Sequence, residues 1–385
     1  MTPAQPRGSF WPTPRQLLIL RVISADDAEA GEAWEQLRPR LELERLELGS
    51  FELMPLLFRR LEDIAPTDPL LAKLAGIYRK TWYTNQLERS RVVPALAALV
   101  EAGTAPLVVN GWELVVAYYR DRGVRAVRGL QVLVSSSQAD AAEHVLRSAG
   151  WQGASPWGPR LPRRAQSTRL MRDGAVCVLH RELFDDFAQA AAATVCAGEG
   201  AVAVRLDGVE ARMLAPADEF LSICLSGARA RSWPDVRWLA DALQISRTAS
   251  LDWQRVVSQA RLLGASLRLE SALLYLRDSL SHGVPPEVLS EIARGESNRR
   301  ERMAHALDSW RGGATGLAPQ SLSRYLRATA GESPFHAAAR LPAFLRDEWG
   351  LRHRRSVPVA VAAKAGARLF ATAAALVRRR AAAGR

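Results

Sequence analysis

The chain has 385 residues, of which 48% are hydrophobic and 24% charged, proportions that are ordinary for a soluble globular protein with room for two domains. Its three cysteines, Cys177, Cys196 and Cys224, are odd in number and widely spaced, which argues against a disulfide framework or a zinc site and for a reducing compartment. The only early apolar run, residues 17–23, is short and contains Arg21. We therefore expect no signal peptide and a cytoplasmic protein.

The net charge of +12 is concentrated in one part of the chain. Residues 299–385 contain 17 Lys and Arg against 5 Asp and Glu, a surplus that equals the net charge of the whole chain. Such a region suits nucleic acid, an anionic membrane or an acidic partner. A solvated, arginine-rich surface explains the same charge equally well.

The first hundred residues predict a loose arm followed by helices. Residues 1–13 contain three prolines and no periodicity, so we expect an arm. Residues 14–102 form a helical region, in which an apolar stripe recurs at helical spacing at Leu53, Leu56, Leu57 and Leu61. A longer helix is expected from about Leu70 toward Val100, with a kink at Pro94. Its aromatic residues suit ligand stacking, but usual burial preferences favour packing against the following sheet; they are Tyr78, Trp82 and Tyr83.

Residues 103–215 carry the clearest mixture of strands and helices. Residues 106–134 predict a strand ending at Asn110, a turn at Gly111, an apolar helix over 112–119, an arginine-rich loop and a strand over 130–134. A glycine at such a turn lets backbone approach a phosphate at a helix N-terminus. A helix over 138–149, strands over 168–171 and 175–179, and a hairpin over 201–214 follow. Strand alternation places Val178 and His180 on one face.

The rest of the chain is predicted to be helical. Residues 216–312 form a helical domain in which Arg237 and Asp241 are spaced for an ion pair, although Arg237 also suits a phosphate. Residues 313–385 form a basic region. Within it, 357–380 predicts a loosely amphipathic helix that suits either an anionic membrane or the protein body, and its central cations argue against a membrane span.

Several of these segments together resemble the bacterial nucleotidyltransferase family related to polymerase-beta-like enzymes. The similar segments are GSFELMPLLFRRLEDI (49–64), IYRKTWYTNQL (77–87), the strand-turn-helix-strand unit of 106–134, VCVLHREL (176–183) and the helices of 220–243. The resemblance covers about residues 14–290. It implies an α+β fold, with a small mixed sheet and flanking helices between N-terminal and C-terminal helical regions.

The resemblance also implies where catalytic residues would stand. Family members carry a lysine where this chain has Asn110, two metal-binding aspartates where it has Gly129 and Gln131, and a third carboxylate where it has Val178. Mg²⁺ takes oxygen ligands, chiefly carboxylates, and none of these three positions supplies one. We therefore expect a degenerate member with no catalytic residue and no metal.

The nucleotide-binding candidates that remain are polar or cationic; they are Asn110, Gly111, Arg125, Arg128, His180 and Arg237. Arg125 and Arg128 beside the former aspartate positions favour binding of an anion, although simple surface exposure explains them equally well. His180 suits either a ligand contact or a structural role.

Three functional hypotheses follow from these observations. The first is a binding or regulatory subunit, paired with an active relative and binding a nucleotide or phosphate ligand. The second is an active transferase that moves a nucleotidyl group from an NTP with Mg²⁺ to a small-molecule, sugar or peptide acceptor, and only this one requires a cofactor. The third is an adaptor that meets a membrane surface, or less favourably nucleic acid, through the basic tail.

Overall fold

The computed structural model describes residues 11–153, 167–184, 187, 194, 198–229, 235–295, 297–308, 317–348, 353, 356–358 and 360. The helix expected within 357–380 therefore lies almost entirely outside the described residues. Within the described part, no helix is both long and apolar enough to cross a bilayer.

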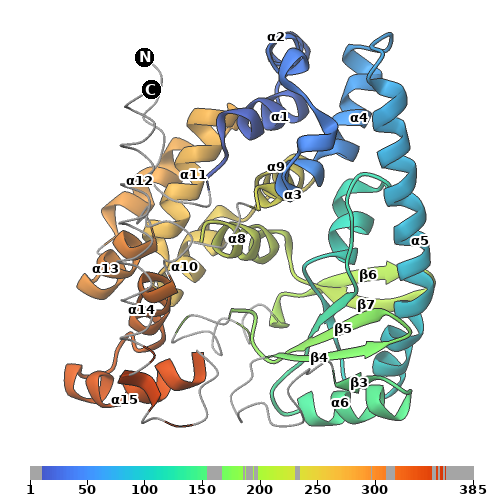
Figure 1. Cartoon of the computed structure of the whole chain (residues 1–385). Coiled ribbons are helices and arrows are strands. Elements are labelled where there is room, and N and C mark those ends of the chain that lie inside the picture. The colour runs from blue at the N-terminus through green and yellow to red at the C-terminus, as the bar shows by residue number, and fades with distance from the viewer. Residues whose placement is uncertain are drawn as a thin grey trace.

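The N-terminal helices form one wall of the molecule (Figure 1). They are α1 (Pro14–Ser24), α2 (Asp27–Leu37), α3 (Leu48–Phe51), α4 (Met54–Ile64) and α5 (Leu71–Glu101), with short 3-10 turns at Arg38–Arg40 and Leu43–Arg45. Thr13 and Gln16 form a capping box that starts α1. Trp11, which the sequence placed in the arm, is buried and stacks on Tyr275 at 4.5 Å between ring centroids. The predicted long helix is confirmed as α5, with Pro94 inside it.

One mixed sheet holds all seven strands of the described residues. The strands are β1 (Leu107–Val108), β2 (Leu130–Leu133), β3 (Gln152–Gly153), β4 (Ser167–Arg172), β5 (Ala175–His180), β6 (Val202–Leu206) and β7 (Val209–Met213). Their order is β3-β4-β5-β2-β1-β7-β6. β1 runs antiparallel to β2, while β2 pairs with β5 and β1 with β7 in parallel. The predicted α+β architecture, with both hairpins, is confirmed.

Helices α5 and α6 (Ala139–Ser148) pack against the sheet, and α5 runs along its side in Figure 1. In β5 buried residues alternate with half-buried ones, so Val178 and His180 share a face as predicted. The helix after Gly111 differs from expectation, because Leu114–Tyr119 form a π-helix. Such widened turns are frequent at functional sites.

The C-terminal half is helical, as predicted. It contains α8 (Pro216–Gly227), α9 (Arg237–Thr248), α10 (Trp253–Leu263), α11 (Ser266–Leu280), α12 (Pro286–Arg294), α13 (Arg299–Asp308), α14 (Leu317–Ala328) and α15 (Pro334–Glu348). Helix α8 is buried around almost its whole circumference, which makes it the central helix of this half. Asp308 at the end of α13 binds Arg268 of α11 and Arg327 of α14, and so ties three helices together.

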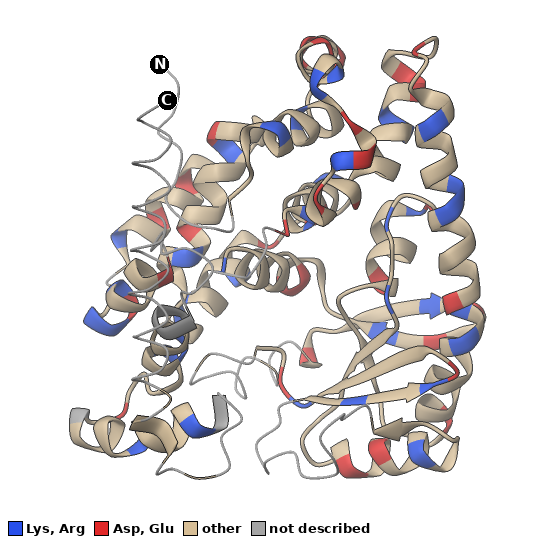
Figure 2. Ribbon diagram, viewed as in Figure 1, with Lys and Arg blue, Asp and Glu red and all other residues tan. Residues whose placement is uncertain are grey.

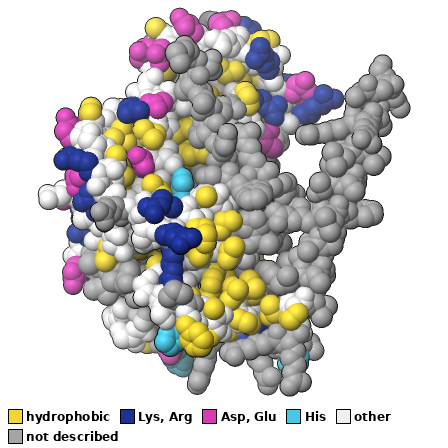
Figure 3. Space-filling model, turned by 90° about the vertical axis from the view of Figure 1, so that its left-hand side faces the viewer, with side chains coloured by type: hydrophobic (Ala, Val, Ile, Leu, Met, Phe, Trp, Pro, Cys, Tyr) yellow, Lys and Arg dark blue, Asp and Glu magenta, His cyan; other side chains and the backbone are white. Residues whose placement is uncertain are grey.

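The surface carries mixed charge and a few exposed apolar side chains. Figure 2 shows basic and acidic residues interspersed over the helices, which fits the even charge balance before residue 299. The C-terminal helices expose Met303 and Phe335, and Figure 3 shows hydrophobic side chains gathered on that side. On α5 the packing prediction was wrong for two aromatic residues, because Trp82 is 45% and Tyr83 68% exposed.

Candidate functional site

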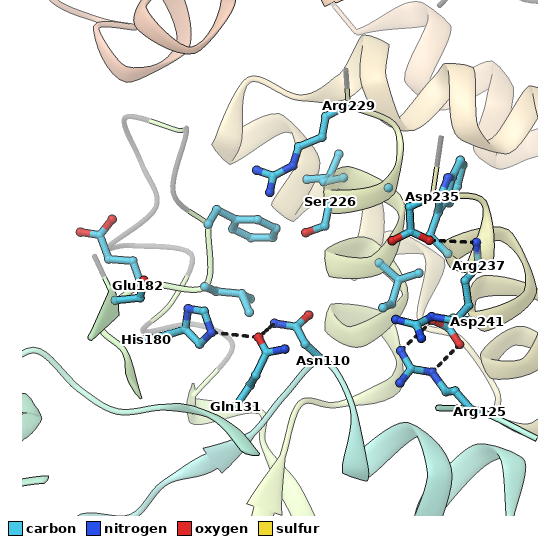
Figure 4. A pocket seen from close by; sticks show the side chains of 17 residues that line it. Asn110, Arg125, Gln131, His180, Glu182, Ser226, Arg229, Asp235, Arg237 and Asp241 are labelled. Atoms are coloured by element: carbon cyan, nitrogen blue, oxygen red, sulfur yellow. Dashed lines mark hydrogen bonds and ion pairs between the residues drawn. The ribbon is translucent and has the colours of Figure 1, made fainter. Parts of the chain in front are cut away.

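A cleft lies where the sheet meets helices α8 and α9 (Figure 4). It consists of two adjoining hollows of about 350 and about 240 Å³, and the larger is in the size range of small-molecule sites. Five residues line both hollows: Asn110, Arg125, Gln131, Asp235 and Arg237. The cleft therefore collects five of the six predicted nucleotide-binding candidates, since His180 lines the larger hollow and Arg128 the smaller one beside Asn110, Arg125 and Arg237.

The floor of the cleft is a hydrogen-bonded chain of uncharged side chains. Gln131 Oε1 accepts a hydrogen bond from His180 Nε2 at 3.1 Å, which places the proton of that imidazole on Nε2. Asn110 Nδ2 donates to the same Gln131 oxygen at 3.4 Å. Asn110 follows β1 in the left-handed conformation, with φ of 61°, which asparagine tolerates better than most residues. The backbone turn thus brings the Asn110 amide beside β2 and β5.

The first expected aspartate position cannot hold a side chain. Gly129 has φ of 83°, and a Cβ built on it would lie 2.3 Å from the carbonyl oxygen of Val176. Any other residue would have to displace the β5 backbone. Val178 lies beside Gln131 in the parallel register, yet it does not line either hollow. On β5 it is His180 that reaches the cleft.

Arg125 is a buried structural cation rather than an exposed one. Its side chain is 4% exposed and makes two hydrogen bonds to Asp241, at 2.8 and 2.9 Å. Tyr119, the last residue of the π-helix, donates to the same carboxylate at 2.9 Å. Burial opposes ionisation of Asp241, but the Arg125 guanidinium and its hydrogen bonds hold the pKa of that carboxyl below its usual range.

The predicted ion pair within α9 is wrong, because Asp241 binds Arg125 instead of Arg237. Arg237 donates to the carbonyl oxygen of Ala126 at 3.0 Å and lies 3.7 Å from Glu52 of the N-terminal region. Arg128 is 68% exposed and donates to the same Glu52 at 2.6 Å. The two arginines that line the smaller hollow therefore share one carboxylate, Glu52.

The loop that carries Arg125 is held by a residue that the sequence analysis did not single out. Asn85 of α5 is 1% exposed, and its Nδ2 donates to the carbonyl oxygens of Arg122 and Arg125 at 2.7 and 2.8 Å. Its Oδ1 accepts from the Val127 amide at 3.0 Å. The only sequence signal for this contact was an asparagine in the middle of a predicted helix, where it cannot cap the helix.

Two buried acids lie behind the cleft and were also missed. Glu113 accepts a hydrogen bond from the Gly111 amide at 2.8 Å, which holds the turn after Asn110. Burial raises the pKa of Glu113 to about 7, although nearby Arg125 opposes the shift. Burial, followed by the charge of Glu113, raises the pKa of Glu219 on α8 well above its usual range. Burial therefore favours the protonated form of both carboxyl groups.

The residues present do not fit a two-carboxylate metal centre. Within the described residues there is no group of three or more His, Cys, Asp or Glu that could hold a metal ion. Carboxylates do line the larger hollow, namely Glu182, Asp235 and Asp241, but Figure 4 shows Glu182 on the opposite side of the pocket from the other two, and Asp241 is paired with Arg125. Asp173, another possible replacement, occupies a hairpin turn with φ of 49° and is absent from both linings.

Comparison with protein families gives a match that includes the whole sheet. A family model described as an uncharacterised nucleotidyltransferase matches residues 50–281, more than half of the chain. The match contains every residue that lines the larger hollow. No curated protein matches the chain.

Proposed function

The chain belongs to the uncharacterised nucleotidyltransferase family, and from that premise we propose that it is a binding or regulatory subunit whose cleft takes a ligand without a catalytic metal. Members of a fold need not share an activity, so the proposal rests on the site and not on the family. An active relative is the partner that such a subunit would serve.

The observation that carries the proposal is the Asn110, Gln131 and His180 floor. Gln131 stands at the position implied for an aspartate, and its oxygen accepts from both neighbours. A neutral amide oxygen that is already bonded twice is a poor ligand for Mg²⁺, which seeks charged carboxylates. Nucleotidyl transfer needs that charge to neutralise the triphosphate and to activate the attacking oxygen. The floor therefore supports binding over transfer.

Calorimetric titration of ATP and GTP, each with Mg²⁺ and with EDTA, tests the proposal on the unmodified protein. We expect that Mg²⁺ neither creates nor strengthens any heat of binding. Incubation with labelled nucleoside triphosphates and cell extract should likewise leave no labelled product.

A variant that supplies carboxylates sharpens this test. Gln131→Asp with Val178→Asp places two carboxylates on neighbouring strands, whereas Gly129→Asp is unsuitable because no Cβ fits there. Gln131→Asn with Val178→Asn is the matched uncharged control. Metal-dependent nucleotide binding should arise only in the aspartate variant, and thermal unfolding should show that both variants are folded. Metal-dependent binding or transfer by the unmodified protein would contradict the proposal and favour an active transferase.

A further inference from the structure

Each of the two amides on the cleft floor forms hydrogen bonds to described residues through only one of its two ends. Asn110 donates through Nδ2, and Gln131 accepts through Oε1. Within the part of the chain that the structure describes, neither Asn110 Oδ1 nor Gln131 Nε2 has a hydrogen-bond partner. Neither atom is sealed from solvent, because neither is among the buried polar atoms that lack a partner. An acceptor and a donor therefore stand open in the cleft.

The two amides that carry these open groups lie next to each other. The hydrogen bond between Asn110 and Gln131 fixes the amides side by side, and Figure 4 shows both at the base of the larger hollow. The Gln131 oxygen faces both His180 Nε2 and Asn110 Nδ2, so the Gln131 nitrogen is the end of this amide that is left for a ligand. A ligand that meets this floor therefore encounters one acceptor beside one donor.

The charged walls of the cleft do not favour a multiply charged anion. The described lining residues comprise four cations and four carboxylates: Arg125, Arg128, Arg229, Arg237, Glu52, Glu182, Asp235 and Asp241. Arg125 is matched by Asp241, and Arg128 by Glu52. A metal-free triphosphate would bring several negative charges beside these carboxylates, which is unfavourable where water is partly excluded.

We infer that the cleft recognises a neutral or zwitterionic ligand through an amide-like edge, in which an N–H donor lies beside a carbonyl acceptor. The ligand N–H donates to Asn110 Oδ1, and the ligand carbonyl accepts from Gln131 Nε2. Apolar side chains of Phe184, Ile223 and Leu225 line the same hollow and contact the rest of the ligand. This inference rests on the proposed metal-free binding role and specifies its ligand class.

Ligand-observed saturation-transfer NMR on the full chain with EDTA tests the inference. The probes are three primary amides, acetamide, nicotinamide and glutamine, each paired with its carboxylate: acetate, nicotinate or glutamate. We expect at least one amide to bind about tenfold more tightly than its carboxylate. Cytidine, whose base has a similar edge, distinguishes a nucleoside source from a peptide or amide source. Tripolyphosphate should bind more weakly than the preferred amide.

Gln131→Glu replaces the donor with an acceptor of the same shape and should weaken binding of the preferred amide by about tenfold or more. Glu143→Gln on α6, a residue outside both linings, is the matched control and should leave binding unchanged. The inference is overturned if no amide is preferred over its carboxylate, if tripolyphosphate binds more tightly, or if Gln131→Glu has no effect. None of these outcomes makes nucleotide binding metal-dependent, so the proposed function can survive them.

Discussion

At the scale of single residues, mutation of the buried pair of Arg125 and Asp241 should reduce the stability of the fold strongly. Asp241→Ala removes the carboxylate that is paired with the buried Arg125 guanidinium, and breaking a buried pair in this way typically costs about 3 to 5 kcal/mol. Urea unfolding should show that loss. Glu62→Ala, which removes a partner of Arg59 at the surface, should cost less than about 1 kcal/mol. Equal costs for the two variants would mean that the pair contributes no more than a surface pair.

The second prediction at this scale concerns pH. Because burial raises the pKa of Glu113 from 4.5 to about 7, the folded protein keeps a proton that the unfolded chain has lost between these values. The free energy of unfolding therefore falls as pH rises through that window. Glu113→Gln keeps a side-chain oxygen that accepts from the Gly111 amide, and it removes the free-energy cost of ionising a buried carboxyl group.

We expect Glu113→Gln to exceed the unmodified protein in stability at about pH 8, by up to about 3 kcal/mol, and to approach it at about pH 5. Denaturant midpoints at both pH values measure the difference. The exposed substitution Glu101→Gln should show no comparable gain. A gain that is the same at both pH values would disprove the role assigned to titration.

At the scale of elements, the backbone at position 129 restricts the residue directly before β2 to glycine. Gly129→Ala combines a left-handed backbone with a contact of 2.3 Å to Val176, so we expect a loss well above the roughly 1 kcal/mol of backbone strain alone. Gly208→Ala in the β6-β7 turn has φ of 87° and open space, and it isolates the backbone effect. Thermal unfolding compares them. If the two losses were equal, an aspartate at position 129 would become conceivable.

The contact between α5 and the loop at 122–127 depends on Asn85. Asn85→Ala removes three hydrogen bonds, two of them fully buried, and should cost about 2 to 4 kcal/mol. Hydrogen exchange should also increase at Val127, whose amide loses its acceptor. Thr84→Ala, one residue earlier on the exposed face, should change stability by less than about 0.5 kcal/mol. If the Val127 amide of Asn85→Ala were as protected from hydrogen exchange as in the unmodified protein, Asn85 would not be what holds this loop.

At the scale of the whole molecule, local patterns predicted the elements better than they predicted the partners. Apolar spacing and turn residues were sufficient to predict α5, both hairpins and every described strand except the short β3. The π-helix and the Asn85 contact are not local properties, because each depends on neighbours distant in the chain. Asp241 illustrates the limit. Helical spacing predicted Arg237 as its partner, but the fold brings Asp241 into contact with Arg125, which lies 116 positions earlier in the chain.

The sequence predicted which residues belong to the candidate site, but not how they are arranged. Asn110, Gln131 and His180 were recognisable as replacements or neighbours of expected catalytic positions. Their mutual hydrogen bonds depend on the left-handed turn at Asn110 and on the pairing of β2 with β5, which sequence alone does not provide. The family resemblance also implied a lost carboxylate at Gly129, where only the folded backbone reveals that no side chain fits.

The most direct measurement of the central claim is titration of the unmodified protein with Mn²⁺, followed by electron paramagnetic resonance of the free ion. A cleft floored by Asn110, Gln131 and His180 should leave the free Mn²⁺ signal unchanged, both alone and with ATP beyond what ATP itself binds. The variant with aspartate at positions 131 and 178 should deplete that signal. Depletion by the unmodified protein, lost when Glu182 or Asp235 is replaced by its amide, would contradict metal-free binding and identify a relocated metal site.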